Sequence, residues 1–317
     1  MQKTLKIITY IIIVTIALII VVLAFFYKSD IPTTVNEEKY FTEESRYITV
    51  DQNKLHIRIT GQGPALLLIH GSFSSLHTWE VWQRNLENDF TTISVDLPGH
   101  GLTGANPQNL YTTDYYSDLL WKLVDQLNYE SISIAGNSMG GQVAYKMALM
   151  NPNKVKQLIL LNSSGVRNQK RVIKTNDGFS VFDLINNPIS AQLMKKVTPK
   201  FLVKMSLKQV YYDHSKFNES KLERYYDLLL NEGNREATMV RFQQKSDSRF
   251  EELSNLEIPT LIIWGEHDNW IPVENAYKFN KIIPNSTLKI YENTGHVPME
   301  EIPLETSQLA KEFILNH

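Results

Sequence analysis

Four short runs of apolar residues do most to limit what this chain can fold into. Each is four or five residues long and nearly or wholly apolar, which is typical of strands that are buried on both faces of a parallel sheet. The runs lie at residues 65–69, 132–135, 158–161 and 261–264. Segments with helical periodicity alternate with them, at residues 115–127, 139–150, 273–282 and 304–315. This order predicts a doubly wound α/β domain with a mostly parallel sheet.

Two further patterns complete the predicted domain. Residues 47–50 and 55–59 alternate apolar and polar side chains around a turn, which predicts an antiparallel hairpin at the start of the domain. Between residues 166 and 255 the alternation of strands and helices stops, and only helical periodicity and turns remain. We expect this interval to be an inserted helical cap. The α/β core would then comprise residues 45–165 and 256–317.

The N-terminal segment is long and apolar enough to span a membrane. Residues 7–27 carry no charged side chain, and about 20 helical residues cover the roughly 30 Å hydrocarbon core of a bilayer. A secretory signal peptide has a shorter apolar region and ends in a small-x-small cleavage site, which is absent here. We therefore expect residues 1–28 to be an uncleaved membrane anchor.

The charges around this segment predict its orientation. Lys3, Lys6 and the free amino terminus precede it, whereas Lys28 is followed closely by Asp30. The positive-inside rule then places the N-terminus in the cytoplasm and the rest of the chain outside, as a single-pass membrane protein. Residues 29–44 are polar and suit a short exposed linker between anchor and domain.

Composition excludes several classes of function. The chain has 32 Lys and Arg against 34 Asp and Glu, and a net charge of -2 provides no overall field that would favour nucleic acid. It has no cysteine, so a disulfide, a thiolate nucleophile and a zinc site built on sulfur are all excluded. Any nucleophile must be oxygen or nitrogen. The sequence implies no metal and no cofactor, and no pattern in it indicates an oligomeric state.

A glycine-flanked serine follows the second apolar run and opens a predicted helix. The stretch reads Gly136-Asn137-Ser138-Met139-Gly140. This strand-turn-helix context is the one that a nucleophile elbow requires, because its sharp turn leaves little room for side chains two residues before and two residues after the nucleophile. Ser138 is therefore the candidate nucleophile. The alternative is a glycine-rich junction in which the serine only caps the helix.

A serine hydroxyl needs a base to take its proton and a carboxylate to orient that base. Asp268 lies just beyond the fourth apolar run, and His296 follows a predicted strand at residues 287–291. Both fall after strand C-termini, where the active sites of open parallel sheets collect. The order Ser138, Asp268, His296 is also the chain order of α/β-hydrolase triads. We expect these residues to be catalytic; the alternative for His296 is an ordinary loop or helix-capping histidine.

The developing oxyanion and the substrate need further groups near Ser138. Backbone amides are the expected oxyanion donors, one from Met139 at the start of the elbow helix and one from Ser72 in the loop after the first apolar run, with Phe73 as the second choice. His70 ends that run, which favours a buried structural histidine over a base. The residues that we place at the substrate pocket are His70, Gly71, Phe73, Asn137 and Val297. Asp96 and His100, in Asp96-Leu97-Pro98-Gly99-His100-Gly101, are expected to shape its rim.

Together these motifs resemble the α/β-hydrolase superfamily from about residue 45 to the C-terminus. Residues 71–79 are similar to bacterial esterases and lipases with a helical cap, and the elbow also looks like that of carbon–carbon bond hydrolases of vinylogous diketones. Those hydrolases usually have a glycine-rich loop after the third strand, from which Ser72-Phe73-Ser74-Ser75 departs. Relatives that open epoxides or remove halide use an aspartate nucleophile, and Ser138 places this chain outside those groups.

The function expected from these residues is cleavage of a small-molecule or lipid carboxylic ester through an acyl-enzyme on Ser138. One alternative is a carbon–carbon bond hydrolase, and another is a catalytically silent binding module on a membrane tether. Two cap segments have apolar faces that either line an acyl pocket or pack the cap on the core, Phe179-Ser180-Val181-Phe182 and Phe201-Leu202-Val203-Lys204-Met205.

The first half of the cap is basic. From residue 166 to residue 208 it holds only two acids, Asp177 and Asp183, against nine basic residues. This face either lies against anionic lipid headgroups or is simply solvated. The nine basic residues are Arg167, Lys170, Arg171, Lys174, Lys195, Lys196, Lys200, Lys204 and Lys208.

Overall fold

A computed structural model describes residues 2–166 and 181–317. Its described part contains one eight-stranded sheet in the order β1-β2-β4-β3-β5-β6-β7-β8. β1 pairs with β2, and β2 with β4, in antiparallel fashion, and every other pairing is parallel. The mostly parallel sheet is thus confirmed. The strands are β1 (Ser45–Val50), β2 (Asn53–Thr60), β3 (Ala65–Ile69), β4 (Thr91–Val95), β5 (Ile132–Asn137), β6 (Val155–Leu161), β7 (Thr260–Gly265) and β8 (Ser286–Tyr291).

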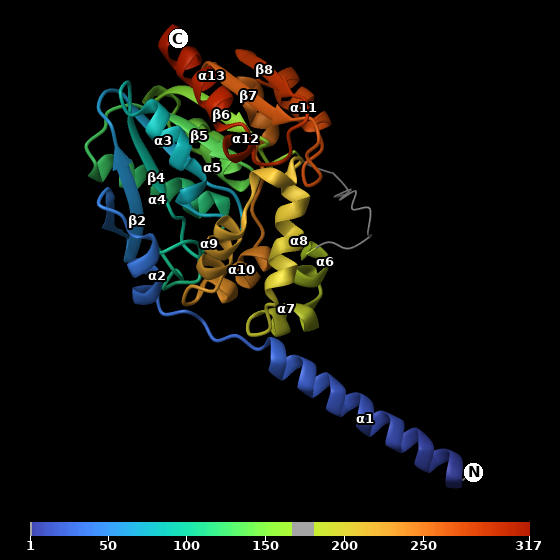
Figure 1. Cartoon of the computed structure of the whole chain (residues 1–317). Coiled ribbons are helices and arrows are strands. Elements are labelled where there is room, and N and C mark those ends of the chain that lie inside the picture. Colours follow the sequence, from blue (N-terminus) through green and yellow to red (C-terminus); the bar gives the residue numbers. More distant parts are fainter. Residues whose placement is uncertain (1, 167–180) are drawn as a thin grey trace.

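Helices cover both faces of the sheet (Figure 1). Side chains alternate between the faces along β3: Leu67 and Ile69 pack with α4, α5 and α11, whereas Leu66 and Leu68 pack with α3 and α13. Burial on both faces explains why the central strands are continuously apolar. These helices are α3 (Glu80–Leu86), α4 (Thr113–Gln126), α5 (Met139–Met150), α11 (Glu274–Ile282) and α13 (Pro303–Asn316); short helical turns are η1 (Leu76–Trp79), η2 (Pro152–Lys154) and α12 (Pro298–Glu301).

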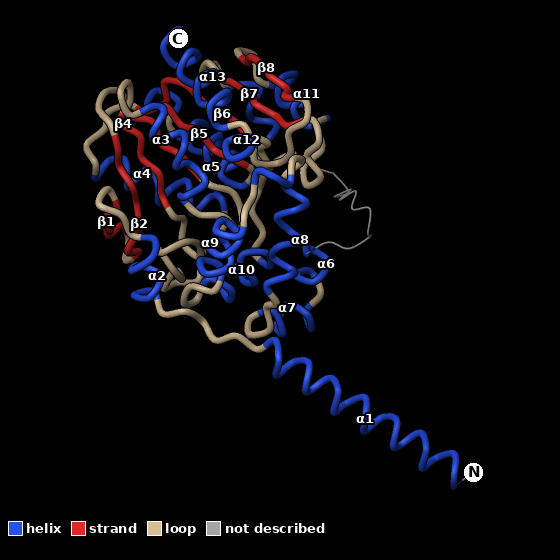
Figure 2. The backbone as a smooth tube through the Cα atoms, viewed as in Figure 1, coloured by secondary structure: helices blue, strands red, loops and turns tan. Residues whose placement is uncertain are grey.

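Between β6 and β7 the described residues form helices and no strand. We call residues 181–255, the described part of the proposed insertion, the cap. Figure 2 shows these helices gathered at one end of the sheet, between it and the N-terminal helix. The cap elements are α6 (Val181–Asn186), α7 (Pro188–Met194), α8 (Lys200–Val210), η3 (His214–Lys216), α9 (Glu219–Leu229), α10 (Asn234–Gln243) and η4 (Phe250–Asn255).

The N-terminal helix α1 (Gln2–Phe26) projects away from the rest of the molecule (Figure 1). By length and composition it can cross a membrane, and none of its residues is buried in the protein. The chain beyond it differs from the exposed linker that we expected. Thr33–Tyr40 form α2, and the fully buried Asn36 donates to the carbonyl of Asp227 and to the Asn231 side chain. Lys39 and the Tyr40 hydroxyl also donate to the Asp227 carboxylate, at 2.8 and 2.9 Å. Polar side chains hold this helix, so hydrophobic periodicity did not reveal it.

Candidate active site

Ser138 occupies the turn between β5 and α5. Its backbone has φ of 54° and ψ of -117°, in a region that residues with a side chain rarely adopt. Glycines on both sides make the turn possible. A Cβ on Gly136 would lie 2.2 Å from the Gly140 carbonyl oxygen, and a Cβ on Gly140 would lie 2.2 Å from the Ile69 carbonyl oxygen. The turn therefore holds a buried but strained serine at the carboxyl edge of the sheet.

His296 and Asp268 are hydrogen-bonded in the loops that follow β8 and β7. Nδ1 of His296 lies 2.6 Å from Oδ2 of Asp268, and both side chains are buried. An ionised carboxylate only accepts hydrogen bonds, so Nδ1 carries the proton and the lone pair of Nε2 remains available as a base. The His296 amide donates to the Val210 carbonyl of the cap at 2.7 Å. The structure thus brings together two of the three predicted catalytic residues by a direct bond.

The elbow lies against both the histidine loop and the loop after β3. The side-chain amide of Asn137 donates to the His296 carbonyl at 3.0 Å. On the other side, a Cβ on Gly71 would lie 2.9 Å from Oδ1 of Asn137 and 3.1 Å from the Ser138 Cβ. The Ser72 hydroxyl is 3.6 Å from the Met139 sulfur. Gly71 therefore allows the loop that carries Ser72 to pack closely against the elbow.

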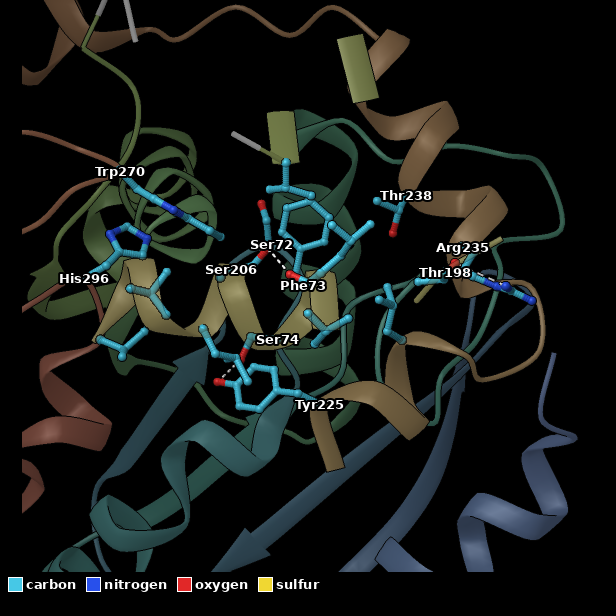
Figure 3. Close-up of a pocket in the computed structure, with 18 of the residues that line it drawn as sticks. Ser72, Phe73, Ser74, Thr198, Ser206, Tyr225, Arg235, Thr238, Trp270 and His296 are labelled. Atoms are coloured by element: carbon cyan, nitrogen blue, oxygen red, sulfur yellow. Dashed lines mark hydrogen bonds between the residues drawn. The ribbon is translucent and has the colours of Figure 1, made fainter. Parts of the chain in front are cut away.

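Two cavities meet at this edge. The first runs from His296 and Trp270 into the cap (Figure 3). Gly71, Phe73, Asn137 and Val297, which we expected at the substrate pocket, are among the residues that line it. The second is lined by Ser138, and the two share Ser72 and Trp270. The cap side chains in the first cavity are mostly apolar: Val181, Met194, Leu202, Val203, Leu207, Val210, Leu229 and Met239, with Thr198, Ser206, Tyr225, Arg235 and Thr238.

Comparison with known proteins identifies the family. A family model described as the alpha/beta hydrolase fold matches residues 64–303, which is most of the chain. The chain belongs to the α/β-hydrolase fold family.

Among its relatives, an uncharacterized hydrolase of Bacillus subtilis, YugF, is 28% identical over 78% of this chain and 89% of its own length. A 2-hydroxy-6-oxononadienedioate/2-hydroxy-6-oxononatrienedioate hydrolase of Pseudomonas putida is 25% identical over 82% of this chain and 91% of its own. The crystal structure of a membrane phospholipase A, described as a bacterial virulence factor, matches with a TM-score of 0.76 at 23% identity and covers 100% of this chain and 99% of that one. That structural likeness shows the shared fold.

In this α/β hydrolase His70 does not line either cavity, contrary to the prediction that it lies at the pocket. The ring is fully buried, with Nδ1 2.7 Å from the Gly71 carbonyl and Nε2 accepting from the Leu97 amide at 3.1 Å. Burial lowers the pKa of His70, so the ring is neutral and both nitrogens are engaged by the backbone. It shapes the loop that carries Ser72 and acts structurally.

Asp96 is also structural, which corrects its predicted place at the pocket rim. It is fully buried and its carboxylate accepts from the His56 ring and from the amides of Leu76 and Leu102. These bonds tie the start of η1 and the loop after β4 to the hairpin. His100 is also buried, with its ring 5.0 Å from that of His70, but it lines a third, smaller cavity that shares Phe73 and Tyr225 with the first. The structure therefore does not contradict its expected place near the pocket rim.

Sequence reasoning missed residues that position the histidine. Asn162 follows β6 directly and donates to Oδ2 of Asp268 at 2.7 Å; its place after an apolar strand is the signal that would have found it. Glu301 accepts from the amides of Gly295 and Asp213 at 2.9 and 2.8 Å, and burial raises the pKa of its carboxyl. Glu301 thereby links the histidine loop to the cap. No local sequence pattern predicts this contact.

Proposed function

We propose that this chain is a membrane-anchored serine hydrolase that cleaves carboxylic esters. Ser138 attacks the ester carbonyl, His296 takes its proton and returns it to the leaving alcohol, and Asp268 orients and stabilises the imidazolium. Water then hydrolyses the acyl-enzyme by the same route. The observation that carries the proposal is the strained Ser138 on its turn beside the two loops whose His296 and Asp268 are hydrogen-bonded at 2.6 Å.

We assign the oxyanion donors to the backbone amides of Met139 and Ser72, with Phe73 as the alternative to Ser72. Met139 is the first residue of α5, and the first amides of a helix have no partner within the helix. The close approach of Gly71 to the elbow supports the second donor. Removal of one such donor in a serine hydrolase costs about 2.7–4 kcal/mol of transition-state stabilisation.

The substrate that we propose is a small-molecule or lipid ester. The largely apolar lining of the first cavity supports an acyl group there, and the similar fold of a membrane phospholipase A adds to this. The proposed anchor, residues 7–27, nearly all of which lie in α1, would hold the enzyme at a membrane with its N-terminus cytoplasmic and its catalytic domain outside.

The test is hydrolysis of p-nitrophenyl esters with short to long acyl chains by the full chain in detergent. Ser138→Ala is expected to lower kcat by roughly 10³-fold or more, because no other group can form the acyl-enzyme. Ser254→Ala, at an exposed position in η4, is the matched control and keeps full activity. Equal activity in Ser138→Ala and the parent chain would refute the assignment.

A second candidate is a carbon–carbon bond hydrolase, and one observation favours it. Arg241 lines the same cavity as Ser138, and a guanidinium there suits a substrate that carries a carboxylate. Relatives named as 2-hydroxy-6-oxononadienedioate hydrolases add support. Turnover of a dienoic diketone carboxylate without turnover of simple esters would select this candidate, and Arg241→Met would then raise KM.

Fluorophosphonate labelling separates both enzymes from the third possibility, a silent binding module. Only an activated serine reacts readily with this probe. We expect labelling of the parent chain and none of Ser138→Ala. A folded parent chain that neither labels nor turns over any substrate would instead be a binding module.

A further inference from the structure

The end of α1 is fixed against the cap. Tyr27 forms an isolated β-bridge with Val197, and the Lys28 amide donates to the Lys196 carbonyl at 2.8 Å. The buried Arg235 then binds the chain just beyond the anchor, donating to Asp30 and, at 2.7 Å, to the Lys28 carbonyl. A helix that spans a membrane therefore brings this end of the cap to the bilayer surface, rather than leaving it on a free tether (Figure 1).

Three large apolar side chains are exposed at this same end. Ile189 and Leu193, four residues apart on one face of α7, are 75% and 43% exposed, and Phe201 at the start of α8 is 52% exposed. The Phe201 ring lies 5.9 Å from the ring of Phe26, the last residue of α1. We call Ile189, Leu193 and Phe201 the cap-end surface. In water such a group of apolar side chains is unfavourable, whereas a bilayer interface would cover it.

The first cavity reaches the inner side of this surface. Met194 and Leu202, the chain neighbours of exposed Leu193 and Phe201, line the cavity. Figure 3 shows His296 and Trp270 at one end of the cavity and Arg235 at the other. The apolar lining thus extends from the proposed catalytic histidine to the residues directly behind the cap-end surface.

Charge contributes less to this end of the cap than the sequence suggested. Four of the nine basic residues, Arg167, Lys170, Arg171 and Lys174, lie outside the described residues. Most of the others are paired with acids, which offsets the attraction that they could exert on anionic headgroups. The pairs are Lys195 with Glu236, Lys196 with Asp30, Lys200 with Glu219 and Glu223, and Lys204 with Glu219.

We propose that the cap-end surface is a second membrane contact, seated in the interfacial region of the same bilayer that α1 spans, and that an acyl chain of a membrane lipid fills the cavity behind it. The second half of this proposal, the acyl chain in the cavity, rests on the proposed function. The partner is a lipid bilayer and not another protein, because the cap-end surface continues directly from the end of the membrane helix through the contact of Phe201 with Phe26.

Membrane contact can be measured without any catalytic readout. The chain has no cysteine, so a single introduced cysteine can be labelled with one environment-sensitive fluorophore. The two labelled variants are Ile189→Cys and Leu193→Cys, each made in the full chain and reconstituted in phosphatidylcholine vesicles. Tyr277→Cys, 56% exposed on α11 and far from α1, is the matched control (Figure 1). We expect spin-labelled lipid to quench both cap-end probes severalfold more than the control. Quenching equal to the control would overturn the membrane contact.

The acyl-chain half is tested with the double variant Ile189→Glu/Leu193→Glu in the same vesicles. We expect hydrolysis of vesicle phospholipid to fall about tenfold, because two carboxylates oppose burial in the interface. Hydrolysis of a short water-soluble ester should stay unchanged, since neither side chain lines the cavity. An equal fall on both substrates, or no fall on either, would overturn this half. A parent chain that cleaves no ester, with quenched cap-end probes, would refute the proposed function and the acyl-chain half but support the membrane contact.

Discussion

Asp268 is the residue on which the hydrogen bonds of the site converge. One carboxylate oxygen accepts from His296 and from Asn162, and the other accepts from the amides of Trp270 and Ile271 at 2.8 and 2.9 Å. With four donors the carboxylate has one orientation, which in turn sets the orientation and tautomer of the imidazole. The centre of the Trp270 ring lies 5.4 Å from that of the His296 ring.

Replacement of Asp268 by asparagine is therefore expected to reduce ester hydrolysis by roughly 10⁴-fold in kcat, with little change in KM. The new side-chain amide presents an N–H to Nδ1 of His296, which donates to the carboxylate in the parent chain. Nδ1 must then accept, so the ring proton moves to Nε2 and Nε2 is no longer free to act as a base. The measurement is steady-state kinetics on a p-nitrophenyl ester, with circular dichroism to confirm folding. Asp118→Asn, on the exposed side of α4, should stay within twofold of the parent chain. Activity in Asp268→Asn above a tenth of the parent value would contradict this role.

At the scale of elements, α12 joins the core to the cap. The side chain of Glu300 is only 5% exposed there. It accepts from the hydroxyls of Thr78 in η1, at 2.5 Å, Tyr211 beyond α8, and Tyr225 in α9, at 2.6 Å. Lys221 also lies 3.3 Å from it. Burial alone would raise the pKa of Glu300, but Lys221 and these hydroxyls outweigh burial and lower it, so the carboxylate is charged at neutral pH.

Glu300→Ala leaves these buried donors without an acceptor, and we expect it to lower the free energy of unfolding by about 3–5 kcal/mol. Hydrogen exchange should speed up first in α8 and α9, because the lost bonds hold these helices to the core. Urea unfolding and exchange mass spectrometry measure the two effects. Glu312→Ala, an exposed carboxylate on α13, is the control and should change stability by less than about 0.5 kcal/mol. Exchange that speeds up evenly over the whole chain would argue against α12 as the link.

The strands of the core could be predicted from the sequence, whereas contacts between residues far apart in the chain could not. β3 was predicted at its observed bounds, because burial on both faces demands an unbroken apolar run. α2 was missed, since its burial depends on Asn36 meeting residues 191 and 195 positions away. Glu301 and Arg235 were missed for the same reason. Ser138, Asp268 and His296 could be proposed because each follows a strand at the edge where the sheet collects its loops.

In the molecule as a whole, the N-terminal helix and the cap lie at the same end. α1 leaves the molecule at the cap, while the C-terminal helix α13 lies at the opposite end (Figure 2). In the proposed anchoring, the cap stands between the sheet and the membrane, and a substrate drawn from the bilayer would meet the cap before the elbow. This arrangement links the proposed anchor to the choice of substrate, because it favours esters that partition into lipid.

The side of the membrane that we predict for this domain rests on the charges that flank α1. Lys3 and Lys6 precede the apolar stretch, whereas beyond it Asp30 offsets Lys28 and is itself bound by Arg235. The positive-inside bias counts charges in short flanks, and long folded domains are translocated largely regardless of their charge, so the lysines of the cap do not reverse it. We expect protease added to intact bacterial cells to remove a C-terminal tag while a cytoplasmic protein stays whole. In Lys3→Glu/Lys6→Glu, which reverses the bias, a measurable fraction of the tag should become protected. A tag protected in the parent chain until the cells are lysed would place the domain in the cytoplasm.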